Sequence, residues 1–291
     1  MTPKLHEGYG AFFYPFITIG KDANLKPVLH PKSYHWFREI ETNQKIGRFQ
    51  ILVSDDGFIF PIGLGGNTRV FLNVLFSTSL FFNLQSRLIA KNSLCKVEWK
   101  ENDNKITITS MNPGSVRSNT AFNRDGKNTI NRMNAFPRKT VSVEKIQEII
   151  DKAYEVYKSH FREEIIMVGE AWSFEFDDSP KTGFLYSWMI IEIFLKNEWE
   201  KYVDGLSISN NRKRTMKHYR IKDIIEQMKT NQIIGETACK TLHILRRRRN
   251  MITHSPTKIK ISKKRSHRCL DVATKIFWNR YYGDKLSRNI R

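Results

Sequence analysis

One short run near the C-terminus contains residue types that handle phosphate groups and protons, Arg249-Asn250-Met251-Ile252-Thr253-His254. A guanidinium presents a fork of N–H donors that matches the oxygens of a phosphate. An imidazole takes up or releases a proton near neutral pH. Three further arginines, Arg246 to Arg248, directly precede the run. The combination indicates chemistry on the backbone of a nucleic acid.

The spacing of arginine and histidine is not specific by itself. Arg212 and His218 also enclose a short spacer, of five residues, and it belongs to the polar stretch from 207 to 217, which shows no apolar periodicity. We interpret that stretch as a solvated loop. Whether the Arg249 run is a functional motif therefore depends on the helix that carries it and on a partner elsewhere in the chain.

Apolar spacing predicts a helix from Glu236 to Thr253, which Ser255-Pro256 would end. Positions three and four residues apart share one face of a helix, so Arg249 falls on the apolar stripe of Leu242, Leu245 and Ile252. Arg246, Asn250 and His254 form a second, polar stripe, rotated by roughly 100°. The arginine is thus expected to point inward, while the asparagine and histidine face a groove.

A second helix, predicted from Pro180 to Val203, carries a charge in the same unusual way. Glu192 shares a stripe with Leu185, Trp188, Leu195 and Trp199. A carboxylate on an apolar face costs free energy unless it is paired. The simplest solution is that Glu192 contacts Arg249 and fixes its guanidinium.

These features resemble the HEPN (higher eukaryotes and prokaryotes nucleotide-binding) superfamily over roughly residues 140 to 281. Its motif is Arg-x4–6-His at the end of a helix, commonly with a polar residue after the arginine, and here an upstream helix carries the inward-facing Glu192. The resemblance implies a helical bundle that pairs as a homodimer. It also implies metal-independent RNA cleavage by attack of the ribose 2′-hydroxyl on the adjacent phosphate.

Carried over to this chain, the resemblance assigns a role to each site residue. Arg249 would hold the scissile phosphate and His254 would transfer protons, while Asn250 and Glu192 would orient them. Arg246, Arg247 and Arg248 would contact further phosphates. Such enzymes often serve as toxins or antiviral defence effectors.

Other interpretations of the same residues stay open. Arg249 could be a structural partner of Glu192 alone, and His254 could be a histidine favoured by the dipole at a helix C-terminus. The chain could bind nucleic acid without cutting it, or its basic half could be a scaffold for an acidic partner protein. The first alternative predicts salt-sensitive binding without product, and the second predicts no affinity for RNA.

The positive charge is concentrated around the motif. Residues 211 to 291 contain 23 lysines and arginines against 5 acidic residues, which places +18 of the net charge of +20 in this segment. Such a field attracts polyanions, and we expect RNA as the partner, with DNA not excluded. Lys258 and Lys260 join the three arginines as expected phosphate contacts. A solubilising basic tail that touches anionic lipid is the alternative.

Composition limits the remaining classes. The opening residues are polar and no stretch approaches 18 uninterrupted apolar residues, so neither a signal peptide nor a membrane span is expected. Cys95, Cys239 and Cys269 lie far apart in no familiar metal-ligand spacing. We therefore expect a reduced cytoplasmic protein that needs no metal or cofactor.

The overall expectation is an α+β protein with a β-rich module over residues 1–140, of unknown role in sensing or recruiting, and an all-α domain over residues 141–291. The first part should contain a strand from Phe12 to Ile19 and two hairpins around Asp56-Gly57 and Asn102-Asp103. A buried helix should follow over 68–89, after a plain glycine turn, and a polar linker over 112–138. The predicted helices of the second part cover residues 143–165, 180–203, 221–228, 236–253 and 267–281.

Overall fold

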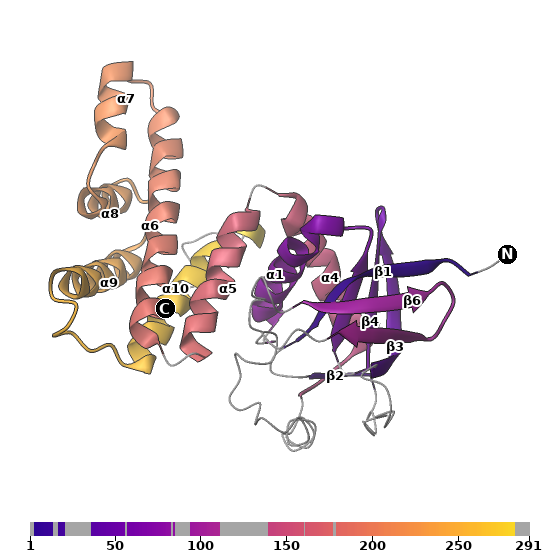
Figure 1. Ribbon diagram of the computed structural model, residues 1–291. Helices are drawn as coiled ribbons and strands as arrows, with labels where there is room; N and C mark the ends of the chain where they lie inside the picture. The colour runs from indigo at the N-terminus through magenta and orange to yellow at the C-terminus, as the bar shows by residue number, and fades with distance from the viewer. Residues whose placement is uncertain are drawn as a thin grey trace. The chain divides into compact units, whose positions relative to one another are not determined.

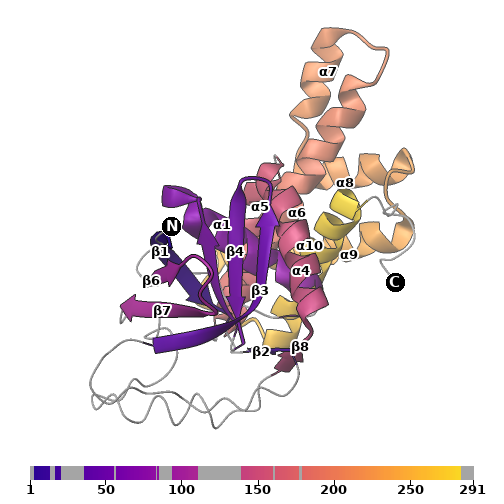
Figure 2. The same ribbon diagram turned by 90° about the vertical axis from the view of Figure 1, so that its right-hand side faces the viewer.

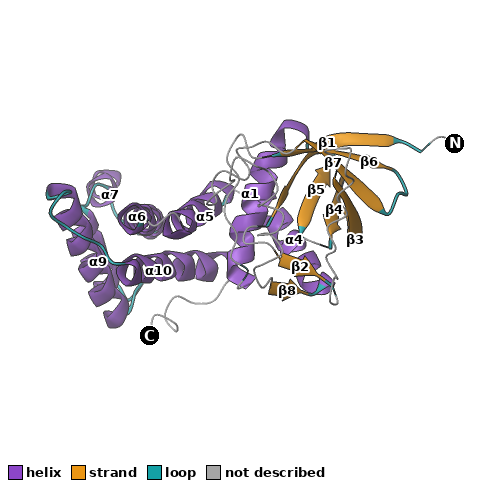
Figure 3. Cartoon of the chain, turned by 60° about the horizontal axis from the view of Figure 1, so that its bottom comes forward, coloured by secondary structure: helices purple, strands orange, loops and turns teal. Residues whose placement is uncertain are grey.

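The computed structural model describes residues 3–13, 17–20, 36–55, 57–82, 84, 94–110, 139–159, 161–176 and 179–282. The fold class is α+β, as expected from the sequence: all described strands precede residue 142, and every described element after that residue is a helix (Figures 1 and 3). The chain divides into two compact units, Met1–Gly169 and Glu170–Arg291.

The first unit is built on a closed antiparallel barrel with the strand order β1-β5-β4-β3-β7-β6 (Figure 2). Alternate side chains of its strands fill the interior, where Leu52, Phe60, Val97 and Trp99 are buried together. The strands are β1 (Leu5–Phe12), β3 (Trp36–Ile46), β4 (Phe49–Ser54), β5 (Phe58–Ile62), β6 (Cys95–Lys100) and β7 (Lys105–Ser110).

Both predicted hairpins are confirmed. Strands β4 and β5 pair on either side of Gly57, which adopts a φ of 77°. Strands β6 and β7 pair on either side of a turn in which Asn102 has a φ of 74°. Glycine and asparagine tolerate this left-handed region better than other residues, and that tolerance is why the turn signals were readable in the sequence.

The single strand expected from Phe12 to Ile19 is wrong. It is divided between the end of β1 and a short strand β2 (Ile17–Ile19), which pairs in parallel with β8 (Lys139–Val141). The glycine segment after β5 forms the 3-10 turn η1 (Gly65–Asn67), which fits the plain turn expected there. The predicted linker over 112–138 lies outside the described residues.

Two of the helices that the structure describes lie wholly within the first unit. Helix α1 (Thr68–Ser79) continues into the 3-10 turn η2 (Leu80–Phe82). It packs against α4 (Val143–Lys158). A hydrogen bond from Lys145 N–H to the Ser142 side chain caps the start of α4. This packing places α4 with the barrel, so the division between the units falls after Gly169 and not at residue 140. The last part of the predicted helix 68–89 lies outside the described residues.

A single helix over 143–165 was the wrong expectation. Ser159 takes an extended conformation that ends α4, and a new helix, α5, follows from Arg162 to Phe176. The helical spacing of apolar residues in α4 continues into α5 and past residue 165, so the sequence shows no sign of the break between them. The break is set by the backbone at Ser159, where the hydroxyl accepts from Phe161 N–H.

Helices α6 to α10 belong to the second unit. The long helix α6 (Pro180–Asp204) packs along α10 (Lys263–Tyr282) (Figure 3), and α8 (Ile221–Thr230) contacts both α6 and α9 (Glu236–His254). The predicted helices at 180–203, 221–228 and 236–253 are confirmed, while α10 begins four residues before the predicted position at residue 267. None of the described helices is long and apolar enough to cross a membrane.

The loop predicted over 207–217 is wrong, because residues Asn210–Lys217 form helix α7. No residue of α7 is buried, so the segment lacks the apolar periodicity that marks most helices. Contacts with α6 fix it instead. Trp199 Nε1 donates to the Met216 carbonyl at 2.8 Å, and Lys217 forms an ion pair with Asp204.

Candidate nucleic-acid site

Helices α6 and α9 bring Glu192 and Arg249 into contact. Arg249 Nη2 donates to Glu192 Oε2 over 3.1 Å, across 57 positions of sequence. The Glu192 side chain is 19% exposed and the Arg249 side chain is 35% exposed, so the pair lies at the edge of the core. The contact expected from the two helical stripes is therefore present, but in a wetter setting than a buried ion pair.

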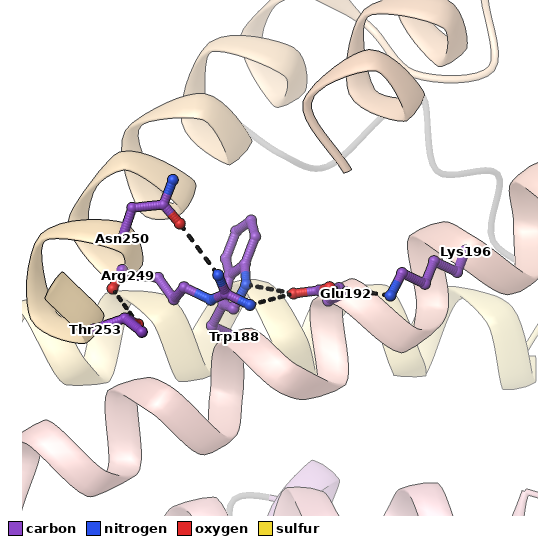
Figure 4. A network of polar contacts seen from close by, with 6 residues as sticks. All are labelled: Trp188, Glu192, Lys196, Arg249, Asn250 and Thr253. Atoms are coloured by element: carbon purple, nitrogen blue, oxygen red, sulfur yellow. Dashed lines mark hydrogen bonds and ion pairs between the residues drawn. The ribbon is translucent and has the colours of Figure 1, made fainter. Parts of the chain in front are cut away.

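Glu192 is the centre of a polar network (Figure 4). Trp188 Nε1 donates to Oε2 at 2.9 Å, and Lys196 Nζ lies 3.1 Å from Oε1. Burial disfavours the charged carboxylate, but the hydrogen bonds from Lys196 and Trp188 and the charge of Arg249 outweigh that effect, so the pKa of Glu192 is lowered. Glu192 is an anion at neutral pH and holds the guanidinium by charge as well as by geometry.

The other end of the guanidinium is tied to its own helix. Arg249 Nη1 donates to Asn250 Oδ1 at 3.2 Å, and Thr253 Oγ1 donates to the backbone carbonyl of Arg249 at 3.0 Å (Figure 4). Arginine carries five N–H donors, and the hydrogen bonds to Glu192 and Asn250 use two of them. The other three donors make no hydrogen bond to the part of the chain that the structure describes.

His254 is placed differently from Arg249. It is the last residue of α9, its side chain is exposed, and it makes no hydrogen bond to any residue that the structure describes. Five residues of α-helix rotate by about 140°, so His254 and Arg249 leave the helix on different sides. The structure joins Asn250, Glu192 and Arg249 into one network and leaves His254 outside it.

The expected phosphate contacts differ in exposure. Arg247, Lys258 and Lys260 are exposed, whereas Arg246 and Arg248 are half-buried. The Nε atom of Arg246 is fully buried without a hydrogen bond. The three exposed cations are accordingly the better candidates for contacts with phosphate groups. Lys181, at the start of α6, donates to the backbone carbonyl of Pro256 and ties down the segment that follows His254.

The structure also assembles a group of side chains that the sequence analysis did not identify. Glu226 on α8 and Cys239 and His243 on α9 place one ligand atom each within 4.8 Å of the others. Cys239 and His243 are four residues apart on one helix, a spacing that was visible in the sequence. Glu226 comes from another helix, which no spacing along the chain could reveal.

Comparisons with family models, with curated proteins and with solved structures returned no match to this chain. The resemblance to the HEPN superfamily thus rests on the Arg249-to-His254 run, on the order of the helices and on the expected contact with Glu192.

Proposed function

We propose that the chain is an RNA endonuclease of the HEPN type, with its catalytic residues in the second unit. The observation that supports this most strongly is the pairing of Arg249 with Glu192. The guanidinium of this partly exposed arginine is held by a carboxylate and an amide, which keep it in a fixed position, and these bonds use two of its five donors. In many enzymes, fixed positive charge beside a developing anion stabilises the transition state more than any other effect.

In the proposed reaction the 2′-oxygen of a ribose attacks the adjacent phosphorus atom and displaces the 5′-oxygen of the next nucleotide. The products are a 2′,3′-cyclic phosphate and a 5′-hydroxyl. Arg249 neutralises the non-bridging oxygens of the transition state. His254 transfers a proton, either from the attacking 2′-hydroxyl or to the leaving 5′-oxygen.

A homodimer would complete this site. One motif offers a single imidazole, whereas the reaction includes two proton transfers, and His254 leaves α9 on a different side from Arg249. A two-fold axis that joins two α9 helices would supply a second copy of each residue. Ile244 and Met251, seven residues apart on α9, are 50% and 46% exposed. They give that helix an apolar stripe that a second copy would cover.

The deciding experiment incubates the full-length protein with mixed RNA in the presence of EDTA. We expect fragments whose 5′-hydroxyl ends a polynucleotide kinase labels directly and whose 3′ ends are cyclic phosphates. Binding without any fragments would favour the alternative of a non-catalytic nucleic-acid-binding protein, which the same basic surface supports. Absence of both RNA binding and RNA fragments would favour the remaining alternative, a scaffold that binds an acidic partner protein.

A further inference from the structure

We infer that Glu226, Cys239 and His243 form a binding site for a zinc ion, separate from the Arg249 network. The three side chains bring a carboxylate oxygen, a thiol sulfur and an imidazole nitrogen together, all within 4.8 Å of one another. Sulfur, nitrogen and oxygen donors are the set that Zn²⁺ uses in proteins. In a tetrahedral zinc site the donors lie roughly 3.3–3.8 Å apart, a spacing that small side-chain rotations reach from here.

The histidine points into this cluster without a satisfactory partner. His243 Nε2 lies 2.8 Å from Glu226 Oε1, yet it is fully buried and makes no hydrogen bond of acceptable geometry. A buried polar atom that lacks a hydrogen bond costs free energy. An ion between the imidazole and the carboxylate would satisfy both groups at once.

The exposures of the three side chains indicate that a bound ion would be covered by protein on one side and open to water on the other. Cys239 is buried, the His243 side chain is 16% exposed and that of Glu226 is 51% exposed. Three protein ligands leave a fourth tetrahedral position on the side of Glu226, where solvent reaches it. A water molecule is the expected fourth ligand.

The thiol must lose its proton to bind zinc. Burial and the neighbouring carboxylate of Glu226 raise the pKa of Cys239, so the free thiol is protonated at neutral pH. Binding then replaces the S–H bond by a Zn–S bond and releases one proton to solvent. The thiolate ligand gives the site a spectroscopic signature that a surface carboxylate site lacks.

The structural consequence would be a link between α8 and α9. Glu226 belongs to α8, and both other ligands belong to α9, where His243 precedes Arg246 by one helical turn. The metal would thereby fix the helix that carries the Arg249 network without touching a substrate. This inference does not depend on RNA cleavage.

The test uses the full-length protein stripped of metal under reducing conditions and titrated with Co²⁺, which substitutes for Zn²⁺ and absorbs visibly. We expect saturation at one ion per chain, a thiolate-to-cobalt charge-transfer band and displacement by one equivalent of Zn²⁺. Proton release should accompany binding, and thermal stability should rise with zinc concentration. Absence of the charge-transfer band in folded wild-type protein overturns the site.

Variants assign the ligands. Cys239→Ser should abolish the band, and Glu226→Gln should weaken zinc binding by at least about tenfold. The second change affects a half-exposed side chain, so it keeps the test valid if Cys239→Ser fails to fold. His267→Gln is the matched control, because His267 is an exposed histidine 3.6 Å from Asp271 and should leave zinc binding unchanged. A band that survives Cys239→Ser, or equal loss in the control, would show adventitious binding.

Discussion

Arg249 on α9 donates a 3.1 Å hydrogen bond to Glu192 on α6, and the same Glu192 oxygen accepts from Trp188. Two charged residues on otherwise apolar helix faces thus satisfy each other at the edge of the core. Because both are half-buried, their coupling is weaker than that of an ion pair deep in a protein but stronger than that of a surface pair.

A double-mutant cycle measures that coupling. We expect Glu192→Ala and Arg249→Ala each to lower the free energy of unfolding by about 1–3 kcal/mol, because each leaves a half-buried charge with fewer partners. The double variant should lose less than the sum, with a coupling of roughly 0.5–2 kcal/mol in urea denaturation. The exposed pair Glu236 and Lys240 is the control and should couple by no more than about 0.5 kcal/mol. Full additivity at Glu192 and Arg249 would contradict the contact.

The pair could be foreseen from helical periodicity, because a charge on an apolar stripe needs a partner and the chain has one such charge on each of two helices. Trp188 and Lys196 could not be identified as further partners in the same way. Their contacts with Glu192 depend on rotamers within α6, and many side chains on one helix share the required spacing.

The elements of the fold also differ in whether local sequence is enough to predict them. Hairpins whose turns need glycine or asparagine, and helices with regular apolar stripes, were readable from local sequence. Helix α7 was not, because the contact of Trp199 with Met216 and the ion pair of Lys217 are tertiary. Closure of the barrel likewise depends on the pairing of β1 with β6, which are separated along the chain by about half of the first unit.

Acid should weaken the Glu192 contribution to stability. The folded-state pKa of this carboxyl is lowered below 4.5, so its contribution is complete above the unfolded-state pKa and is lost as the pH falls through the folded-state pKa. The difference in unfolding free energy between wild type and Glu192→Gln should therefore shrink below pH 4.5. Chemical denaturation of both proteins across that range tests it, and a difference that grows on acidification would contradict the assignment.

His254→Gln should abolish RNA cleavage while leaving folding and RNA binding unchanged. The side chain is exposed and makes no hydrogen bond to the described part of the chain, so its loss removes no structural contact. His218→Gln is a closely matched control, because His218 is also exposed at the C-terminal end of a basic helix. Cleavage assays on both variants, with circular dichroism to confirm folding, decide the role. Undiminished RNA cleavage by the His254→Gln variant would contradict the catalytic role of His254.

The affinity for RNA should depend steeply on salt through the exposed cations of the second unit. Replacing Arg247, Lys258 and Lys260 by glutamine removes three expected phosphate contacts, which should reduce the slope of log affinity against log salt by about 2 for a single strand. The triple change of Lys45, Lys96 and Lys100 removes the same charge from the barrel unit, where we expect little effect. Filter binding or fluorescence anisotropy at several salt concentrations gives both slopes. Equal slopes for the two triple variants would show that the charge acts only as a general field.

The apolar stripe on α9 gives a direct test of the proposed homodimer. Ile244 and Met251 are half exposed, and seven residues bring them to the same side of the helix, away from the buried Leu242 and Leu245. Ile244→Glu together with Met251→Glu should convert a dimer into a monomer that keeps the helical circular dichroism spectrum of the wild type. Met189→Glu, a similarly exposed methionine on α6, is the control and should leave the dimer intact.

Light scattering reports the mass, and the same samples are assayed for RNA cleavage. If the site needs two copies of the motif, cleavage falls with the dimer. A wild-type protein that is monomeric and active at assay concentration would instead show that one Arg249 and one His254 suffice.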